Sequence, residues 1–227
     1  SRARIALIQN IWKDKQYDKV ISISRSAQEY NPEEMVFYYF EGFAQYMKKE
    51  NEAALQTFKK GVAQIKPDSD PNIVSDFYAV MGDILHEKGL EKQAFEAYDS
   101  CLHWRPDNLS ALNNYAYYLS LTKSDLKKAE LMSYKTIKKE PTNSTFLDTY
   151  AWILFLQGRY EEANTYIEQA IKNDSTPSGT LFEHAGDIYY QAGKPEAALE
   201  AWQKALQLGN NSATLRKKIN LKKYIPE

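Results

Sequence analysis

Histidine and cysteine are the side chains most able to act as acid, base, nucleophile or metal ligand near neutral pH, and this chain has three histidines and one cysteine. His86, His103 and His184 lie in different parts of the sequence, with no acid and nucleophile at close spacing. No Cys/His cluster has metal-ligand spacing, and no glycine-rich phosphate loop occurs. We therefore expect no active site, metal or cofactor. Cys101 is interpreted as a buried structural thiol, with a reactive thiol as the alternative.

Two acids occupy matching places in segments of similar sequence. Asp83 and Asp187 each follow a glycine, in the segments 78–85 and 181–189. Each segment is followed at matching distances by a glycine, an alanine, an aromatic residue and a small residue. A repeated acid favours a repeated surface over a catalytic pair, and His184 beside it is interpreted as a packing or capping residue. The period of about 34 residues is typical of stacked helical pairs, which present a long concave face to a partner.

Composition narrows the classes of function. The 227 residues carry a net charge of −1, which gives no basic footprint for nucleic acid. No apolar run is long enough to span a bilayer, and the single cysteine excludes an internal disulfide. The start Ser-Arg-Ala-Arg runs directly into a helical pattern, so we expect a processed product or an excised fragment.

Small and large residues recur at fixed positions of the repeat. The six repeats cover approximately residues 1–34, 35–74, 75–108, 109–143, 144–178 and 179–211. The eighth position is small from the second repeat on: Gly42, Gly82, Ala116, Ala151 and Gly186. The twenty-fourth is large in four repeats, where we expect a knob that packs on the next repeat: Phe58, Tyr98, Ile167 and Trp202. Glycines Gly89, Gly158 and Gly193 mark turns between paired helices, and we assign that role to Asn51 in the second repeat.

This pattern resembles the tetratricopeptide repeat (TPR) family over essentially the whole chain. The resemblance implies an all-α, right-handed α-solenoid: six TPR helical hairpins in a single array over residues 1–227, with a C-terminal capping helix at 212–224. The loop 66–72 is interpreted as a spacer between the second and third repeats, and Ser212 as the N-cap of the last helix. We expect Leu215 and Ile219 of that helix to face inward and its five Lys and Arg side chains to face water. A basic patch for phosphate or anionic lipid is the alternative.

In TPR proteins the first helix of each repeat lines the inner groove. None of the inner positions that the resemblance marks in repeats two to six is Lys or Arg, so we expect an acidic and aromatic groove that binds a basic or apolar peptide or protein. This departs from the basic clamp with which chaperone-binding members hold acidic tails. The candidate partner-binding residues are Tyr39, Phe43, Tyr46, Asp83, His86, Glu87, Asn113, Tyr117, Asp148, Trp152, Phe155, Glu183, Asp187 and Tyr190. The alternative is that these aromatics pack between repeats, with Trp152 and Phe155 largely buried. On the groove hypothesis, Asp148→Lys with Asp187→Lys abolishes partner binding without changing thermal stability.

Three functions stay open at this point. The first is a scaffold or adaptor that recruits a protein partner. The second is the substrate-recruiting or regulatory arm of a larger enzyme or assembly. The third is self-association through the first repeat, where we expect Ile5, Leu7, Ile8, Ile11 and Trp12 to be exposed. The similarity to bacterial TPR proteins, some of them secreted or lipid-anchored, suggests the cell envelope, with the cytoplasm as the alternative.

Overall fold

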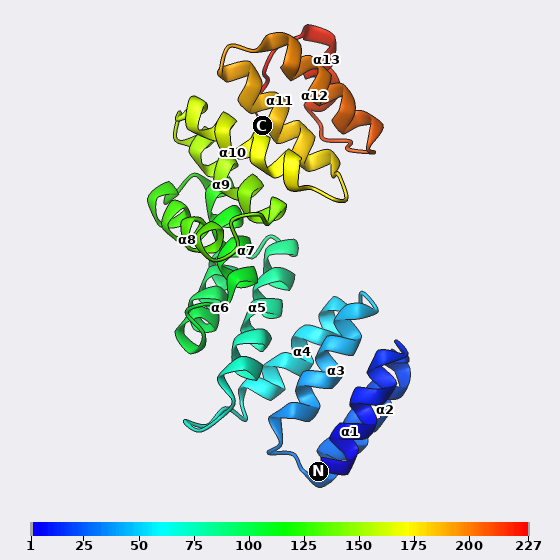
Figure 1. Cartoon of the computed structure of the whole chain (residues 1–227). Coiled ribbons are helices and arrows are strands. Elements are labelled where there is room, and N and C mark those ends of the chain that lie inside the picture. The colour runs from blue at the N-terminus through cyan, green and yellow to red at the C-terminus, as the bar shows by residue number, and fades with distance from the viewer. Residues whose placement is uncertain (1, 227) are drawn as a thin grey trace. The chain divides into compact units, whose positions relative to one another are not determined.

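The computed structural model describes residues 2–226, and Figure 1 shows a succession of helices along the chain. The regular elements of this part of the chain are all α-helical, in six consecutive pairs and one additional short helix. They are α1 (Arg2–Lys13), α2 (Tyr17–Tyr30), α3 (Met35–Met47), α4 (Asn51–Val62), α5 (Pro71–Glu87), α6 (Glu91–Trp104), α7 (Leu109–Thr122), α8 (Leu126–Lys139), α9 (Ser144–Leu156), α10 (Tyr160–Asn173), α11 (Gly179–Gln191), α12 (Pro195–Gln207) and α13 (Leu215–Leu221). The expected all-α class, with six hairpins and a terminal helix, is confirmed.

The helices form two compact blocks. The N-terminal block is residues 1–111 and the C-terminal block is residues 112–227, with the division inside α7. Each block has apolar cores of its own, built where paired helices meet and where one pair meets the next. The single array over the whole chain stays a prediction.

A glycine and an aromatic ring set the close approach of the helices in three pairs. A methyl group on Gly42 would lie 2.5 Å from the ring of Phe58, and one on Gly186 would lie 2.3 Å from the ring of Trp202. The ring of Tyr98 likewise occupies the space that a methyl group on Gly82 would need. Both partners belong to the same repeat, so the large residue packs on the glycine of its own hairpin. Phe58 also lies 5.5 Å from Phe77 of the next repeat, which is the contact expected for this position.

The turns inside the hairpins need one residue with positive φ. Gly89, Gly158 and Gly193 supply it at φ between 72° and 80°. In the second repeat Lys49 takes this conformation at φ 64°, while Asn51 begins α4, so the role assigned to Asn51 is wrong. In the fourth repeat Lys123 does the same at φ 54°. A lysine there is strained, because its Cβ crowds the backbone that glycine leaves free.

The joint between the second and third repeats lies earlier in the chain than expected. α4 ends at Val62 and α5 begins at Pro71, so the last two residues of the expected spacer are helical. The Asp70 carboxylate caps α5 by accepting the backbone N–H of Asn72 at 2.8 Å. Pro71 follows at the first helical position, where a missing N–H costs nothing.

The C-terminal helix is shorter than the expected range 212–224, and one of its lysines is buried. The Ser212 hydroxyl accepts the backbone N–H of Leu215 at 3.2 Å, and Leu215 is buried beside Trp202. Lys218, which we expected to face water, is fully buried. Lys222 ends the helix in the left-handed conformation at φ 51°.

The first repeat hides most of the apolar edge that was expected to be exposed. Ile8 is fully buried, and Ile5, Ile11 and Trp12 are partly buried against the same core. Leu7 is the member of the set that stays open, at 48% exposure. Self-association through this edge therefore stays a prediction with a smaller apolar surface than expected.

None of the helices among residues 2–226 combines the length and the apolar character that crossing a bilayer requires.

Candidate functional site

The first helices of the N-terminal block carry partly exposed aromatic side chains. Tyr39, Phe43 and Tyr46 of α3 are all partly buried, and the rings of Tyr39 and Phe43 lie 4.5 Å apart. Phe43 rests edge-on against the buried Phe58 at 5.4 Å, which supports it from below. The three residues recur at spacings of four and three because one face of an α-helix repeats at that interval. They form an aromatic stripe along α3.

Acidic groups of α5 lie alongside this aromatic stripe. The Tyr39 hydroxyl donates to Asp76 Oδ2 at 3.3 Å, and burial together with that carboxylate raises the pKa of Tyr39 to about 12. Burial raises the pKa of Tyr46 as well, and the charges of Asp83 and Glu87 raise it further, which places these two acids near its ring. Asp83 accepts a hydrogen bond from the Tyr98 hydroxyl, and Glu87 accepts one from the side-chain amide of Asn51 at 2.7 Å. His86 pairs instead with Glu91 at 3.0 Å.

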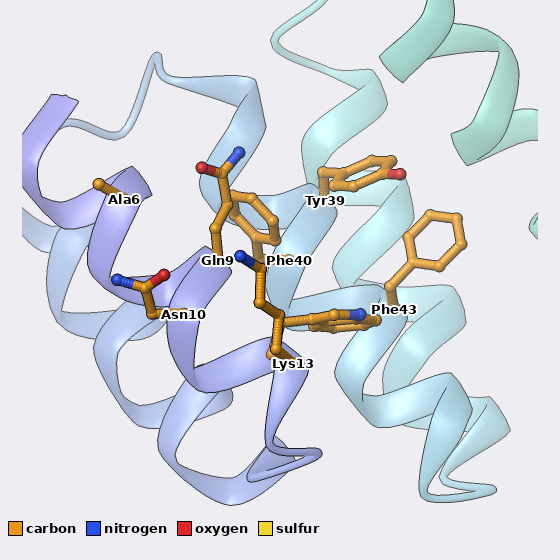
Figure 2. A pocket seen from close by; sticks show the side chains of 8 residues that line it. Ala6, Gln9, Asn10, Lys13, Tyr39, Phe40 and Phe43 are labelled. Carbon is orange, nitrogen blue, oxygen red and sulfur yellow. The ribbon is translucent and has the colours of Figure 1, made fainter.

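A pocket opens between α1 and α3 at one edge of the stripe (Figure 2). Its volume is about 470 Å³, and its walls combine apolar rings with a few polar side chains. α3 contributes three rings and α1 contributes an indole, two amides, a lysine and a methyl group. The lining residues are Ala6, Gln9, Asn10, Trp12, Lys13, Tyr39, Phe40 and Phe43. Concave, mostly apolar pockets with a few polar groups are the usual form of binding sites.

The α1 side of this pocket was missed in the sequence. Gln9, Trp12 and Lys13 stand at positions nine, twelve and thirteen of the first repeat, which are inner positions in the later repeats. The same count applied to the degenerate first repeat would have found them.

The aromatic candidates of the C-terminal block are mostly packed. Trp152 and Phe155 of α9 are buried and stacked at 4.9 Å, and Trp152 also stacks on His184 at 4.2 Å. Tyr117 lies 6.1 Å from His184, and Tyr190 lies 5.9 Å from Trp202; both rings are partly exposed. The packing alternative is therefore correct for Trp152 and Phe155.

Two further candidates of this block are polar and largely enclosed. Asn113 of α7 is buried and donates to Asn114 at 3.4 Å. Asp148 of α9 is partly buried and lies 2.8 Å from Nδ1 of His184. Burial opposes the charge of His184, yet the carboxylate of Asp148 raises its pKa above the ordinary value. This pair joins α9 to α11 and is not directed at solvent.

The two acids of α11 are paired with one buried lysine. Lys218 Nζ lies 2.9 Å from Glu183 Oε1 and 2.8 Å from Asp187 Oδ2, and the three side chains are nearly inaccessible. Asp187 also accepts the indole N–H of Trp202 at 2.9 Å. Burial raises the pKa of Asp187 to about 6, while bonds from Ser212 and Lys218 hold the pKa of Glu183 below its ordinary value against burial. Both acids are thus ionised at neutral pH and paired with a cation.

This arrangement corrects the expected acidic groove in the C-terminal block. Glu183 and Asp187 line a pocket of about 180 Å³ together with Tyr117, Trp152 and His184. The acids are nevertheless nearly inaccessible, because Lys218 of α13 pairs with both of them. Asp187→Lys would place a second cation against Lys218, so the proposed double variant would destabilise the block and would not test binding alone. In the N-terminal block, acidic and aromatic side chains are accessible together. They are Tyr39, Phe43, Tyr46, Asp83 and Glu87.

The remaining chemistry-bearing groups show no built site. Cys101 is fully buried, and burial raises the pKa of its thiol to about 11, so the thiol is protonated at neutral pH. Within residues 2–226, no group of three His, Cys, Asp or Glu side chains is arranged to hold a metal ion.

Comparison with known proteins agrees with this architecture. Tetratricopeptide repeat family models match residues 75–108 and 151–213. The type IV pilus assembly protein PilF of Pseudomonas aeruginosa is 26% identical over 152 residues, which is 66% of this chain and 60% of that protein. This chain therefore spans about three fifths of that relative's length.

Solved structures show the same fold at low sequence identity. The structure of Pseudomonas aeruginosa PilF superposes with a TM-score of 0.73 at 13% identity, over 95% of both chains. YrrB, described as a TPR protein with an unusual peptide-binding site, superposes with a TM-score of 0.66 at 18% identity, over 87% of this chain and 97% of that one. With its six helical hairpins, its glycine and aromatic repeat positions and these matches, the chain belongs to the tetratricopeptide repeat family.

Proposed function

We propose that this chain is a protein-binding scaffold, and that its N-terminal block holds an extended segment of a partner in the pocket between α1 and α3. TPR proteins generally mediate interactions between proteins, and the fold offers stacked first helices as a surface. The observation that carries the proposal is the pocket of about 470 Å³ lined by Trp12, Tyr39, Phe40 and Phe43. Four aromatic rings around one pocket are the side-chain types that supply most binding energy at interfaces.

The charges around the pocket indicate the partner's chemistry. Asp83 and Glu87 of α5 lie near Tyr46 at one end of the aromatic stripe, where they favour a Lys or Arg of the partner. Lys13 lines the pocket itself, where it favours an acidic or carbonyl group. The expected ligand is a segment with one large apolar side chain for the pocket and a basic residue on the side of α5.

Phage selection on the immobilised full chain tests this proposal with defined peptides. Random peptides selected on the wild type should be enriched in an aromatic or large aliphatic residue accompanied by Lys or Arg. The dissociation constants of the selected peptides, made synthetically, are then measured by fluorescence anisotropy. Gln9→Trp should weaken binding of these peptides about tenfold or more, because the new ring fills the pocket from an exposed position of α1 without removing a core contact.

Charge reversals provide a matched comparison. Glu87→Lys should weaken binding of the same peptides about three- to tenfold, whereas Glu96→Lys, a reversal that is also exposed and lies on the second helix of that hairpin, should leave affinity unchanged. Peptides that bind Gln9→Trp as tightly as the wild type would reject the pocket as the binding site. Equal effects of Glu87→Lys and Glu96→Lys would reject the assigned role of the α5 acids.

A further inference from the structure

We propose that the C-terminal block contains a second subsite, for the aromatic side chain of a partner peptide, which the chain's own Tyr224 fills in the structure. It is distinct from the pocket between α1 and α3, because its residues all belong to the C-terminal block. The proposal rests on the seat of one ring, on the open volume beside it and on the charges around it.

Tyr224 is seated on a stack of rings. Its ring meets Phe155 edge-on, with 5.6 Å between centroids and 81° between planes. Phe155 in turn stacks on Trp152, and Trp152 on His184. An edge-to-face contact on a buried, rigid stack is a favourable seat for any aromatic ring, since it matches the quadrupoles of the two rings. The occupant shown by the structure therefore defines the ligand's class.

The seat adjoins space that Tyr224 does not fill. A cavity of about 400 Å³ is lined by Tyr224 together with Trp152, Leu156 and Leu121, and by Ser120, Lys123 and Asp187. This volume is in the range of small-molecule and peptide side-chain sites. A peptide that placed its aromatic residue where Tyr224 lies would have room there for the adjoining main chain.

One residue that lines this cavity carries a buried polar group without a partner. Trp152 Nε1 is inaccessible and has no hydrogen-bond acceptor among residues 2–226. An indole N–H almost always finds an acceptor when it is buried, because leaving it unpaired has a free-energy cost. A ligand that displaced Tyr224 and carried a carbonyl or carboxylate oxygen to this N–H would relieve that cost, whereas Tyr224 does not.

The charge of this subsite differs from that of the N-terminal pocket. Lys218 pairs with both Glu183 and Asp187, and its Nζ lies 5.8 Å from the centre of the Tyr224 ring. The exposed Lys123 stands at the rim of the cavity. Because Glu183 and Asp187 are nearly inaccessible and paired with Lys218, the exposed charge at the cavity is that of Lys123. The subsite should therefore accept an aromatic residue next to an acidic or neutral residue, and should disfavour one next to lysine.

The test uses the four tryptophan indole N–H signals of the ¹⁵N-labelled full chain, assigned by single Trp→Phe variants. The probe is N-acetyl-L-tyrosinamide. In Tyr224→Ala the Trp152 signal should move at a probe concentration about tenfold lower than in the wild type, because the internal ring no longer competes for the seat. Tyr224→Phe should behave as the wild type, since the ring rather than the hydroxyl occupies the seat. Leu221→Ala, at a residue 58% exposed on the preceding helix, serves as the matched control and should also behave as the wild type.

The other three indole signals report whether Tyr224→Ala keeps the fold. A second measurement needs no variant: in the wild type, saturating probe should remove the nuclear Overhauser contact between the Tyr224 and Phe155 rings. Equal half-saturation in the wild type and Tyr224→Ala, no shift of Trp152 up to the solubility limit of the probe, or an intact Tyr224–Phe155 contact at saturation would overturn the proposal. These outcomes concern the C-terminal block alone and leave the N-terminal pocket to its own test.

Discussion

Lys218 of α13 and Asp187 of α11 form a buried ion pair, with 2.8 Å between Nζ and Oδ2. The same ammonium lies 2.9 Å from Glu183, so one lysine from the last helix pairs with two acids of the sixth repeat. Burial lowers the pKa of Lys218, but the two carboxylates raise it by more than burial lowers it. The pKa of Lys218 is therefore above its ordinary value. α13 thus covers the last hairpin of the C-terminal block with a charge pairing in addition to the apolar contact of Leu215.

Removing this cation should weaken the C-terminal block strongly. Lys218→Met leaves two carboxylates buried without their partner, which costs about 3–5 kcal/mol unless α13 detaches and lets water in. Urea unfolding should show that loss, or hydrogen exchange should show unprotected amides over Leu215–Leu221. Lys217→Met, at the exposed neighbour, should stay within about 0.5 kcal/mol of the wild type. Indistinguishable unfolding and exchange in the two variants would contradict the assigned role of Lys218.

The contact between Gly186 and Trp202 should be intolerant of a methyl group. Gly186→Ala places a Cβ 2.3 Å from the indole, so the ring or the helix must move, at a cost of about 1–3 kcal/mol. A side chain smaller than the indole at position 202 should restore part of the loss. Gly186→Ala with Trp202→Leu should therefore be more stable than the sum of the two single changes predicts. Strictly additive free energies of unfolding for the pair would show that the two positions do not share one packing constraint.

The lysine at the turn of the fourth repeat offers a stabilising change. Lys123 has φ 54°, and glycine adopts that conformation without the Cβ penalty, so Lys123→Gly should raise the unfolding free energy by about 1 kcal/mol. Lys135→Gly makes the same chemical change inside α8, where it should lower stability by about 1 kcal/mol. Thermal melting of both variants checks the opposite signs. Shifts of the same sign would mean that backbone conformation does not govern the effect at Lys123.

The His184 and Asp148 pair predicts a pH dependence. The pKa of His184 is raised above 6.5, so the folded state binds its proton more tightly than the unfolded state does. The stabilisation is complete below pH 6.5 and is lost as the pH rises through the folded pKa. The free energy of unfolding should therefore fall as the pH rises above 6.5, and Asp148→Asn should flatten that slope. His103→Gln, at an exposed histidine, should keep the wild-type slope; an unchanged slope in Asp148→Asn would contradict the account.

The repeat made most of the fold predictable from the sequence. Glycine at position eight and a large residue at position twenty-four locate the paired helices, because few other residues allow so close an approach. The turn at Lys49 was not predictable in this way. Lysine has no preference for positive φ, whereas asparagine, which stands two residues later at Asn51, tolerates it. The pairing of Lys218 was hidden for a related reason: lysine at a helix surface is almost always solvated, and the acids that bury it stand more than thirty residues earlier.

The candidate site was predictable only in part. A position rule selects side chains that point to the inner face of a helix, and it placed Tyr39, Phe43 and Tyr46 correctly on one partly exposed stripe. It does not register what later segments place on that face, and α13 with Tyr224 covers the face of the last repeats. Exposure depends on contacts distant in sequence, which a local count does not contain.

The most direct test of the central claim is the indole N–H spectrum of the ¹⁵N-labelled full chain while a phage-selected peptide is added to saturation. Trp12 is the tryptophan that lines the pocket between α1 and α3, and Trp202 is fully buried in the C-terminal block. The account predicts a progressive shift of the Trp12 signal, with the affinity measured by anisotropy, and an unmoved Trp202 signal. A Trp12 signal that stays in place while the peptide saturates the chain would contradict it.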